Sequence, residues 1–199
     1  AKGSVLMNLV NSGLEVVWFS DRHPDDTIYC ICVDRESATV TVVFYDEEST
    51  LSRLRNSSMM DHPNPLLDED YEGNSDLIQI RAAVSEDILR PRRDSGKSTI
   101  DEICEKVDKI GEELKAAGSH RYNLTITGHS KAGGLATVCG FYIAANPSVL
   151  ELTSAVKIYA FASSHVGGKT FHDSFKHLEE TGRLLHARFT NSNELDSLP

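Results

Sequence analysis

The 199-residue sequence lacks the features that would assign it to a membrane, secreted-precursor or repeat class. No apolar run approaches the roughly 20 residues of a membrane-spanning helix, and the start lacks the basic segment and hydrophobic block of a secretory signal. There is no internal repeat and no low-complexity tract. Basic residues number 20 against 30 acidic ones, and the net charge of -10 argues against sequence-independent binding of nucleic acid.

Cysteine is also scarce, with four residues at Cys30, Cys32, Cys104 and Cys139. Cys30 and Cys32 lie two apart in a strand-like run. We expect them to point to opposite faces, where they can neither share a metal nor form a disulfide. Buried free thiols are the expected state of the four residues, which weakly favours a reducing, intracellular compartment and leaves localisation open.

What is present fits one globular domain. Apolar residues make up 40% of the chain and charged residues 25%, an ordinary composition, and the length is sufficient for a sizeable core. We therefore expect a single domain over residues 1–199. Because the sequence starts at an alanine and stops at Pro199 inside a motif described below, we expect this domain to be partial.

The stretch from Tyr122 to Ala145 has the pattern of a strand followed by a buried helix, with Ser130 at the junction. Small residues, Gly128 and Ala132, lie two positions before and two after this serine. A serine on such a tight turn is typical of the nucleophile elbow of α/β-hydrolases, where bulk on either side would collide with the strand or the helix. The amide of Lys131 would then face a developing oxyanion.

The rest of the sequence alternates strand-like and helix-like segments. Runs rich in Val, Ile, Thr and aromatic residues predict strands, and apolar residues at helical spacing predict helices. The predicted strands are 27–33 and 38–45, which form a hairpin, then 77–80, 156–161 and 184–189; the predicted helices are a broken one within 5–19, then 49–60, 81–89, 98–118 and 171–180. At Ser98 we expect Glu102 to complete a capping box. This order predicts an α/β fold with a mainly parallel sheet, an N-terminal β-hairpin and helices on both faces.

Three motifs follow one another along the second half of the chain. They are Gly128-His-Ser-Lys-Ala-Gly-Gly-Leu-Ala136, then Phe161-Ala-Ser-Ser-His-Val-Gly-Gly168 with Phe171 after it, and finally Arg188-Phe-Thr-Asn-Ser-Asn-Glu-Leu-Asp-Ser-Leu-Pro199. Together with Val42-Val-Phe44, they make the sequence resemble the class 3 lipases, the fungal-lipase-like branch of the α/β-hydrolase fold. That family has Gly-His-Ser-Leu-Gly-Gly-Ala-Leu-Ala, Phe-Gly-Ser-Pro-Arg-Val-Gly-Asn and Arg-Val-Val-Asn-x-x-Asp followed by Leu-Pro.

The resemblance implies a carboxylic-ester hydrolase that acts on acylglycerols or related lipid esters through a covalent acyl-enzyme. Ser130 would be the nucleophile, and serine acyl chemistry needs no cofactor and no metal. Anchored on Asn191, the family's acid position falls on Glu194, which we favour, or on Asp196 if the loop is one residue shorter. Anchored on the final Leu-Pro pair, it falls on Asn193. The implied partners are the lipid ester and, transiently, a lipid interface, with no nucleic acid.

The base departs from the family pattern. In the family the catalytic histidine follows the acid, but no histidine follows Glu194 in this sequence, so we expect the base beyond residue 199. His165, at the family's arginine position, is the best internal substitute. His129, beside the serine, is expected to be packed and hydrogen-bonded rather than catalytic.

The oxyanion segment departs as well. The family has Phe-Arg-Gly-Ser or Phe-Arg-Gly-Thr where this sequence has Phe44-Tyr-Asp-Glu47. The amide of Glu47 is the expected second donor, with Ser49 or Thr50 as alternatives, although carboxylates oppose the charge that an oxyanion hole stabilises. The following segment, 49–60, is either a lid or an amphipathic helix packed on the core. These acids favour a second hypothesis, a catalytically degraded lipase-like module that binds lipid or a protein partner.

Overall fold

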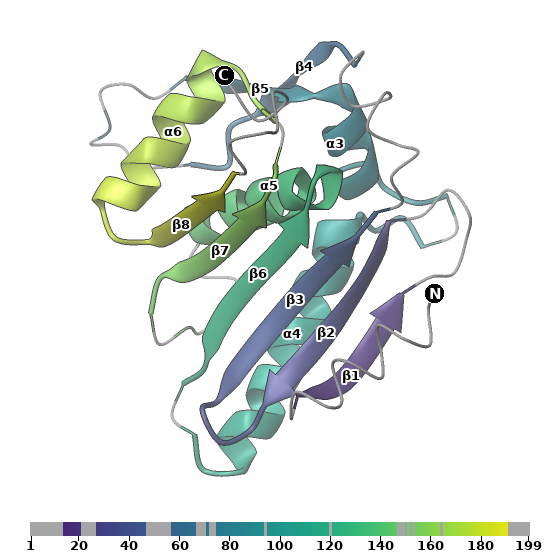
Figure 1. Cartoon of the computed structure of the whole chain (residues 1–199), viewed down its shortest axis with the longest axis vertical. Coiled ribbons are helices and arrows are strands. Elements are labelled where there is room, and N and C mark those ends of the chain that lie inside the picture. The colour runs from purple at the N-terminus through teal and green to yellow at the C-terminus, as the bar shows by residue number, and fades with distance from the viewer. Residues whose placement is uncertain are drawn as a thin grey trace.

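A six-stranded sheet forms the centre of the molecule (Figure 1). The computed structural model describes residues 14–20, 27–46, 57–66, 71, 75–93, 95–119, 121–146, 150, 152, 154–163 and 165–190. In spatial order, the strands are β1 (Glu15–Ser20), β2 (Ile28–Asp34), β3 (Thr39–Tyr45), β6 (Asn123–His129), β7 (Val156–Phe161) and β8 (Leu184–Phe189). The β1–β2 and β2–β3 pairs are antiparallel, whereas β3, β6, β7 and β8 run parallel. The predicted mainly parallel sheet with an N-terminal hairpin is therefore confirmed.

The β2–β3 hairpin closes on a turn that its own side chains stabilise. The carboxylate of Asp34 accepts hydrogen bonds from the backbone N–H groups of Glu36 and Ser37 and from the Ser37 hydroxyl. Ala38 completes the turn with a positive φ of 48°. Side-chain hydrogen bonds of this kind fix a turn, and the turn fixes the register of the two strands. As a result the carboxyl end of β3 lies beside that of β6.

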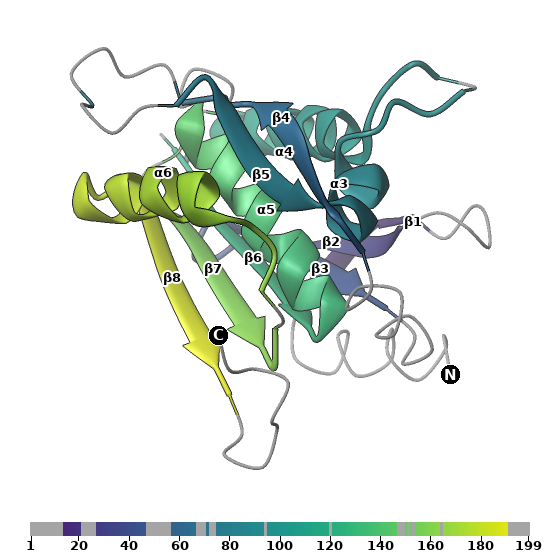
Figure 2. The same cartoon turned by 90° about the horizontal axis from the view of Figure 1, so that it is seen from above.

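Four described helices and a small two-stranded sheet pack on one face of the central sheet (Figure 2). The helices are α3 (Ala82–Ile88), α4 (Thr99–Ala116), α5 (Lys131–Ala145) and α6 (Lys169–Glu180), and the small sheet pairs β4 (Met59–Pro63) with β5 (Leu77–Arg81). We predicted helices on both faces, but the part of the chain that the structure describes places none on the other face. The predicted strand at 77–80 and the helices at 81–89, 98–118 and 171–180 are confirmed.

The hydrophobic core lies between the central sheet and these helices. Alternate strand residues point inward, so that Val42, Ile126 and Ile158 lie side by side and are fully buried. Helix α5 is buried along almost its whole length, and after Lys131 its sequence is almost entirely apolar, as such burial requires. Helix α4 instead buries one stripe, at Ile103, Val107, Ile110 and Leu114. Each fully buried aliphatic side chain contributes about 1.5–3 kcal/mol.

The opposite face of the sheet carries exposed aromatic side chains on β7 and β8. Tyr159, Phe161 and Phe189 are 39%, 42% and 49% exposed. Their rings stack on one another, with 4.8 Å between the centroids of Phe161 and Phe189 and 6.5 Å between those of Tyr159 and Phe189. These contacts run along the sheet surface, so the aromatic face differs from the helix-covered face, where aromatic rings pack into the core.

Two of the predicted helices are wrong where the structure describes them. Residues 15–19 of the helix predicted at 5–19 belong to strand β1, which pairs with β2. Residues 59 and 60, predicted to end a helix, open strand β4. In β1 the run Val-Val-Trp-Phe is β-branched and aromatic, which favours a strand once a partner strand is available. Residues 5–13 of the first predicted helix, and 49–56 of the second, lie outside the described ranges.

The capping box of α4 uses a different acid from the one predicted. Asp101 occupies the third helical position: its N–H donates to the Ser98 hydroxyl, and its carboxylate accepts from the Ser98 N–H. Glu102 is one residue too far along the helix for this role. Its carboxylate instead accepts a hydrogen bond from Arg92 at 2.7 Å.

The prediction for Cys30 and Cys32 is also wrong. Residues two apart in a strand share a face, and the two Sγ atoms are 3.9 Å apart on the same side of β2. All four cysteines are free thiols, as predicted. The hydrogen bond between the pair raises the pKa of Cys30 and lowers that of Cys32.

Candidate active site

Ser130 occupies the sharp turn between β6 and α5 with a strained backbone. It is the N-terminal cap of α5, and its φ of 60° and ψ of -124° lie in a region that residues with a side chain rarely adopt. Its N–H donates to the carbonyl of Phe161 on β7 at 2.8 Å, and its carbonyl accepts from Gly133 at 3.1 Å. These bonds hold the turn from the neighbouring strand and from the helix, so the strain is maintained by the surrounding structure.

The small residues around Ser130 allow the strand and the helix to approach closely. A Cβ atom added at Gly128 would lie 2.3 Å from the carbonyl oxygen of Ala132, and one at Gly133 would lie 3.1 Å from the carbonyl of Gly128. Both distances involve backbone atoms, which cannot move aside as a flexible side chain does. Ala132 is itself buried. Gly128 and Gly133 therefore require the absence of a side chain, and at Gly128 this is the steric reason that the sequence pattern indicates.

The parallel strands end at one edge of the sheet, and Ser130 lies at that edge. In the strand register, His129 is level with Phe161, and Phe161 is level with Phe189. On the other side Val43 of β3 pairs with Thr127, two residues before the end of β6. The segments that follow β3 and β8 thus leave the sheet at the elbow, the usual position of ligand sites in parallel sheets. The predicted oxyanion residue Glu47 and the acid candidates Glu194 and Asp196 belong to these segments and lie outside the described residues.

Lys131 contributes its backbone and its side chain in different ways. As the first residue of α5, it has an N–H without an intrahelical acceptor, and the helix dipole favours negative charge there. Its side chain is almost fully buried and pairs with Asp87 of α3, with 2.6 Å between Nζ and the carboxylate and side-chain exposures of 5% and 15%. The sequence interpretation used only the amide of Lys131 and missed this partner. A lysine in an otherwise apolar helix is the signal that a buried acid must lie nearby.

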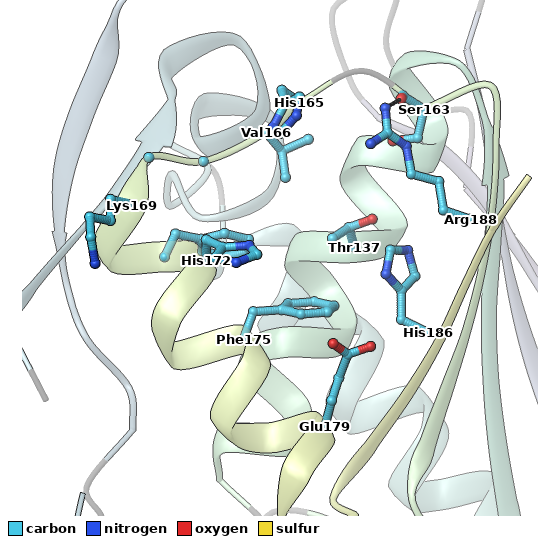
Figure 3. A pocket seen from close by; sticks show the side chains of 13 residues that line it. Thr137, Ser163, His165, Val166, Lys169, His172, Phe175, Glu179, His186 and Arg188 are labelled. Carbon is cyan, nitrogen blue, oxygen red and sulfur yellow. Dashed lines mark hydrogen bonds between the residues drawn. The ribbon is translucent and has the colours of Figure 1, made fainter. Parts of the chain in front are cut away.

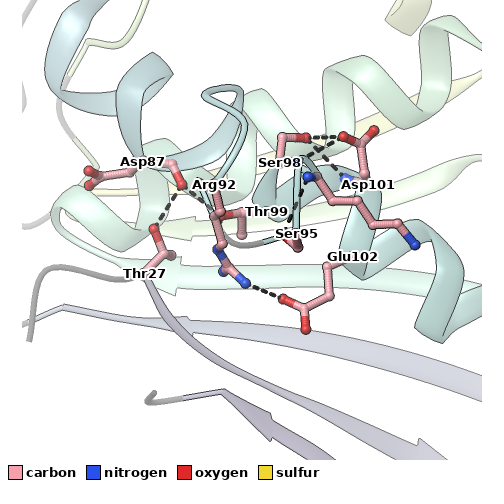
Figure 4. A network of polar contacts seen from close by, with 9 residues as sticks. Thr27, Asp87, Arg92, Ser95, Ser98, Thr99, Asp101 and Glu102 are labelled. Carbon is pink, nitrogen blue, oxygen red and sulfur yellow. Dashed lines mark hydrogen bonds and ion pairs between the residues drawn. The ribbon is translucent and has the colours of Figure 1, made fainter. Parts of the chain in front are cut away.

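Asp87 ties this ion pair to two further segments (Figure 4). Its carbonyl accepts hydrogen bonds from the hydroxyl of Thr27, just before β2, at 3.0 Å and from that of Thr99, at the start of α4, at 2.8 Å. Arg92 lies beside them and pairs with Glu102 of α4. The first turn of α5, the end of α3, the start of α4 and the start of β2 are therefore held as one unit behind the elbow.

Within the part of the chain that the structure describes, neither His129 nor His165 forms a hydrogen bond with Ser130. His129 is exposed on the aromatic face of the sheet, so the expectation of a packed histidine is not met. His165 lies on the loop between β7 and α6, where its carbonyl accepts a hydrogen bond from Arg81. Partial burial and the charge of Arg188 hold the pKa of the His165 imidazole below its ordinary value.

The described ranges contain neither a cluster of metal-ligating side chains nor a helix suited to a membrane. Across them, no group of three or more His, Cys, Asp or Glu side chains is arranged to hold a metal ion. In the same ranges, no helix combines the length and the apolar character needed to cross a membrane.

Comparison with known proteins gives a family match and several matches of fold. The family model described as lipase (class 3) matches residues 74–195, more than half of the chain. A lipase of Rhizomucor miehei, solved as a propeptide complex, has a TM-score of 0.65 at 14% identity, over 92% of this chain and 51% of that one. A triacylglycerol lipase from Penicillium expansum has a TM-score of 0.63 at 14% identity, over 92% and 65%. A third triacylglycerol lipase, whose catalytic centre is described as a serine protease triad, has a TM-score of 0.59 at 15% identity, over 89% and 57%.

At these identities the solved structures establish a shared fold. The chain spans about half to two thirds of their length. No curated protein sequence gives a significant match. The family match begins just before β5 and runs through the elbow at Ser130 to the segment after β8, so it includes β6, β7 and β8 at this edge of the sheet but not β3. The chain belongs to the class 3 lipase family.

Proposed function

We propose that this protein is a serine carboxylic-ester hydrolase that cleaves acylglycerols or related lipid esters through a covalent acyl-enzyme. The observation that carries the proposal is the strained backbone of Ser130 at the junction of β6 and α5. Such a conformation costs on the order of 1–3 kcal/mol, which a serine with only a packing role would not require. Membership of the class 3 lipases and the fold of triacylglycerol lipases support the same function.

The proposed reaction begins when the Ser130 hydroxyl attacks the ester carbonyl and gives its proton to a base. The tetrahedral intermediate then carries a negative charge on the former carbonyl oxygen. The N–H of Lys131 and the positive end of the α5 dipole would stabilise that charge, with the amide of Glu47 as the second donor. Collapse of the intermediate expels the alcohol and leaves an acyl-serine, which water hydrolyses in the second half of the reaction.

The remaining triad members are assigned by family position. We propose Glu194 as the acid that orients the base, with Asp196 as the alternative. Their segment follows β8, whose end is level with that of β6. For the base we propose a histidine beyond residue 199, and His165 is the internal alternative.

Covalent labelling tests the proposal directly. The intact protein is treated with a fluorophosphonate probe, and the modified peptide is identified by mass spectrometry. We expect one labelled serine, Ser130, and ester hydrolysis that falls by about 10³-fold or more in Ser130→Ala, because the acyl-enzyme can no longer form. Ser154→Ala is the matched control, because this exposed serine bonds to Asn123 at 2.9 Å, at the opposite end of β6 from the elbow. This variant should keep both the labelling of Ser130 and the rate of ester hydrolysis.

A negative result would favour the second hypothesis, a degraded module that binds lipid or a protein partner. The specific observation behind that hypothesis is the acidic run Asp46-Glu-Glu48 where an oxyanion loop is expected. The loss of one oxyanion donor typically costs about 2.7–4 kcal/mol of barrier. Equal hydrolysis by the protein and by Ser130→Ala, together with an unlabelled Ser130, would overturn the enzymatic proposal.

A further inference from the structure

A basic loop joins α3 to α4 and stands out from an acidic protein. Residues 89–98 contain four basic side chains and one acidic side chain, whereas the whole chain has a net charge of -10. Figure 2 shows this loop in teal, projecting beyond α3 and away from the central sheet. The loop contains none of the residues assigned to the elbow, so its charges have no part in the proposed hydrolysis.

The base of the loop is anchored, and its tip is open. The side chain of Arg92 pairs with Glu102 of α4 at 2.7 Å, and the N–H of Arg92 donates to the carbonyl of Lys97 at 3.0 Å. At the tip, Gly96 has a left-handed φ of 68°, and among the described residues a Cβ atom added there would have no neighbour within 4 Å. An exposed turn of this kind opens locally at little cost while the rest of the fold stays intact.

Ser95 presents its hydroxyl at this tip. It is exposed, and its Oγ accepts the N–H of Lys97 at 3.3 Å, so its own proton is not used in that bond. The next two hydroxyl residues, Ser98 and Thr99, are only 4% and 3% exposed, because Ser98 caps α4 and Thr99 bonds to Asp87 (Figure 4). A macromolecule that approaches the loop can therefore reach the hydroxyl of Ser95 but not those of Ser98 and Thr99.

Exposed cations flank Ser95 on both sides. Arg90 and Arg93 precede it by five and two positions, and Lys97 follows it by two. Lys97 pairs with Glu105, but these side chains are 51% and 57% exposed, so the pair holds the lysine only weakly. Positive charges around an exposed serine are the pattern that protein kinases with an acidic substrate groove recognise.

We propose that Ser95 is a phosphorylation site for a protein kinase that reads basic residues, with MgATP as the phosphate donor. The Ser95 Oγ attacks the γ-phosphorus and forms the new O–P bond, while the bond between the γ-phosphorus and the β,γ-bridging oxygen breaks and ADP leaves. The hydroxyl proton passes to the catalytic aspartate of the kinase. The phosphate brings about -1.5 to -2 charges at pH 7, and Arg93 and Lys97 lie close to it in the chain to pair with it.

Ser58 provides a comparison within the same protein. It follows Arg53 and Arg55 by five and three positions, so its sequence is also basic on one side. Its backbone, however, directly precedes β4, and its carbonyl accepts the N–H of Ala82 at 2.8 Å. A kinase groove takes the segment around the serine away from its own protein, which at Ser58 would require β4 to detach. Ser58 is therefore expected to stay unmodified.

Phosphorylation of the intact, folded protein tests this inference. The protein is incubated with MgATP and the catalytic fragment of protein kinase C, which accepts basic residues on both sides of a serine, and the product is analysed by intact mass and by peptide mapping. We expect a single phosphate, on Ser95, and no phosphate in Ser95→Ala. Arg93→Gln removes one flanking charge and should lower kcat/KM for phosphorylation about tenfold, because a charge-assisted contact with the kinase is lost.

The controls separate recognition of this loop from unspecific phosphorylation. Arg121→Gln changes an exposed arginine between α4 and β6, outside the loop, and should leave kcat/KM unchanged, as should Ser58→Ala. An unmodified Ser95, phosphate on Ser58 in its place, an unchanged kcat/KM in Arg93→Gln, or modification of Ser95 only after heat denaturation would each overturn the proposal. Ser130→Ala should be phosphorylated like the original protein, so this proposal and the hydrolase proposal fail independently.

Discussion

Helix α5 separates two polar environments that are built in opposite ways. On its α3 side, the buried charges of Lys131 and Asp87 are paired at 2.6 Å. On its α6 side, the buried Nε2 of His186 has no partner in the described ranges and borders a cavity of about 410 Å³ between α5, α6 and β8 (Figure 3). A paired and closely packed polar group can fix the position of an element. An unpaired one beside a cavity does not fix the position of its element in this way.

The α3 side illustrates the first case. The family elbow has a leucine where this chain has Lys131, so this chain has a buried ion pair directly after the proposed nucleophile. Buried ion pairs are often no more stabilising than apolar residues of similar size, because both charges lose their hydration. A buried ion pair instead fixes the relative position of the two segments that carry its charges. The backbone carbonyl of Asp87 also accepts hydrogen bonds from Thr27 and Thr99. The residue that holds Lys131 is thus itself held by two other segments, and the pair aligns the first turn of α5 with α3, with the start of α4 and with the start of β2.

The largest effect is expected from breaking this pair on one side only. Asp87→Leu leaves the ammonium of Lys131, whose side chain is 5% exposed, without a counter-charge. Removal of one partner of a buried pair typically costs about 3–5 kcal/mol, and guanidinium denaturation monitored by circular dichroism measures the loss. Lys131→Met should cost less, because the Asp87 carboxylate that it leaves behind is 15% exposed and keeps more hydration.

The double variant Asp87→Leu/Lys131→Met serves as the control. It removes both charges, and we expect its free energy of unfolding to lie within about 1 kcal/mol of the original protein. If the two single changes add up in the double variant, the side chains do not interact and the pair does not align the elbow.

The sequence predicts the α6 side less completely than the α3 side, for a physical reason. Strands 156–161 and 184–189 and the helix near 171–180 follow from local patterns, and the structure confirms them. Their lateral arrangement also follows, because parallel strands need crossover helices. The cavity between them depends on which side chains fail to fill the space around Phe175. That is a property of packing in three dimensions, and no periodicity in the sequence records it.

At the elbow and in strands β1 and β4, too, the sequence predicts local features but not contacts between distant segments. The steric demand for a small residue at Gly128 is local, so the sequence reveals it. The partner of Lys131 lies 44 positions away, on a different helix, and only the need of a buried lysine for an acid points to it. Strand β1 and the first two residues of β4 fall in predicted helices because each strand depends on a partner strand, and helical spacing in a short segment carries no information about that partner.

The α6 side should also respond to pH. Burial, together with the charge of Arg188, lowers the pKa of His186 in the folded protein, and partial burial lowers those of His165 and His62. The unfolded chain therefore binds protons more readily, so stability is fully present above about pH 6.5 and is lost as the pH falls through that value. Denaturation curves from pH 8 to pH 5 measure this slope, which for one histidine cannot exceed about 1.4 kcal/mol per pH unit. In His186→Phe the slope should be smaller, and profiles parallel to the original protein would show that His186 does not titrate with folding.

The smallest effect is expected on the outer surface of α6, where charges are paired but exposed. Lys176 and Glu180 lie 3.3 Å apart, with side chains 62% and 63% exposed, so water already solvates both groups. Lys176→Ala should therefore change the free energy of unfolding by only about 0.3–0.5 kcal/mol, and the change should shrink as salt is added. The same denaturation assay measures it beside Asp87→Leu. A cost for Lys176→Ala that approached that of Asp87→Leu would mean that burial does not distinguish the two pairs, and the contrast between the two sides of α5 would not hold.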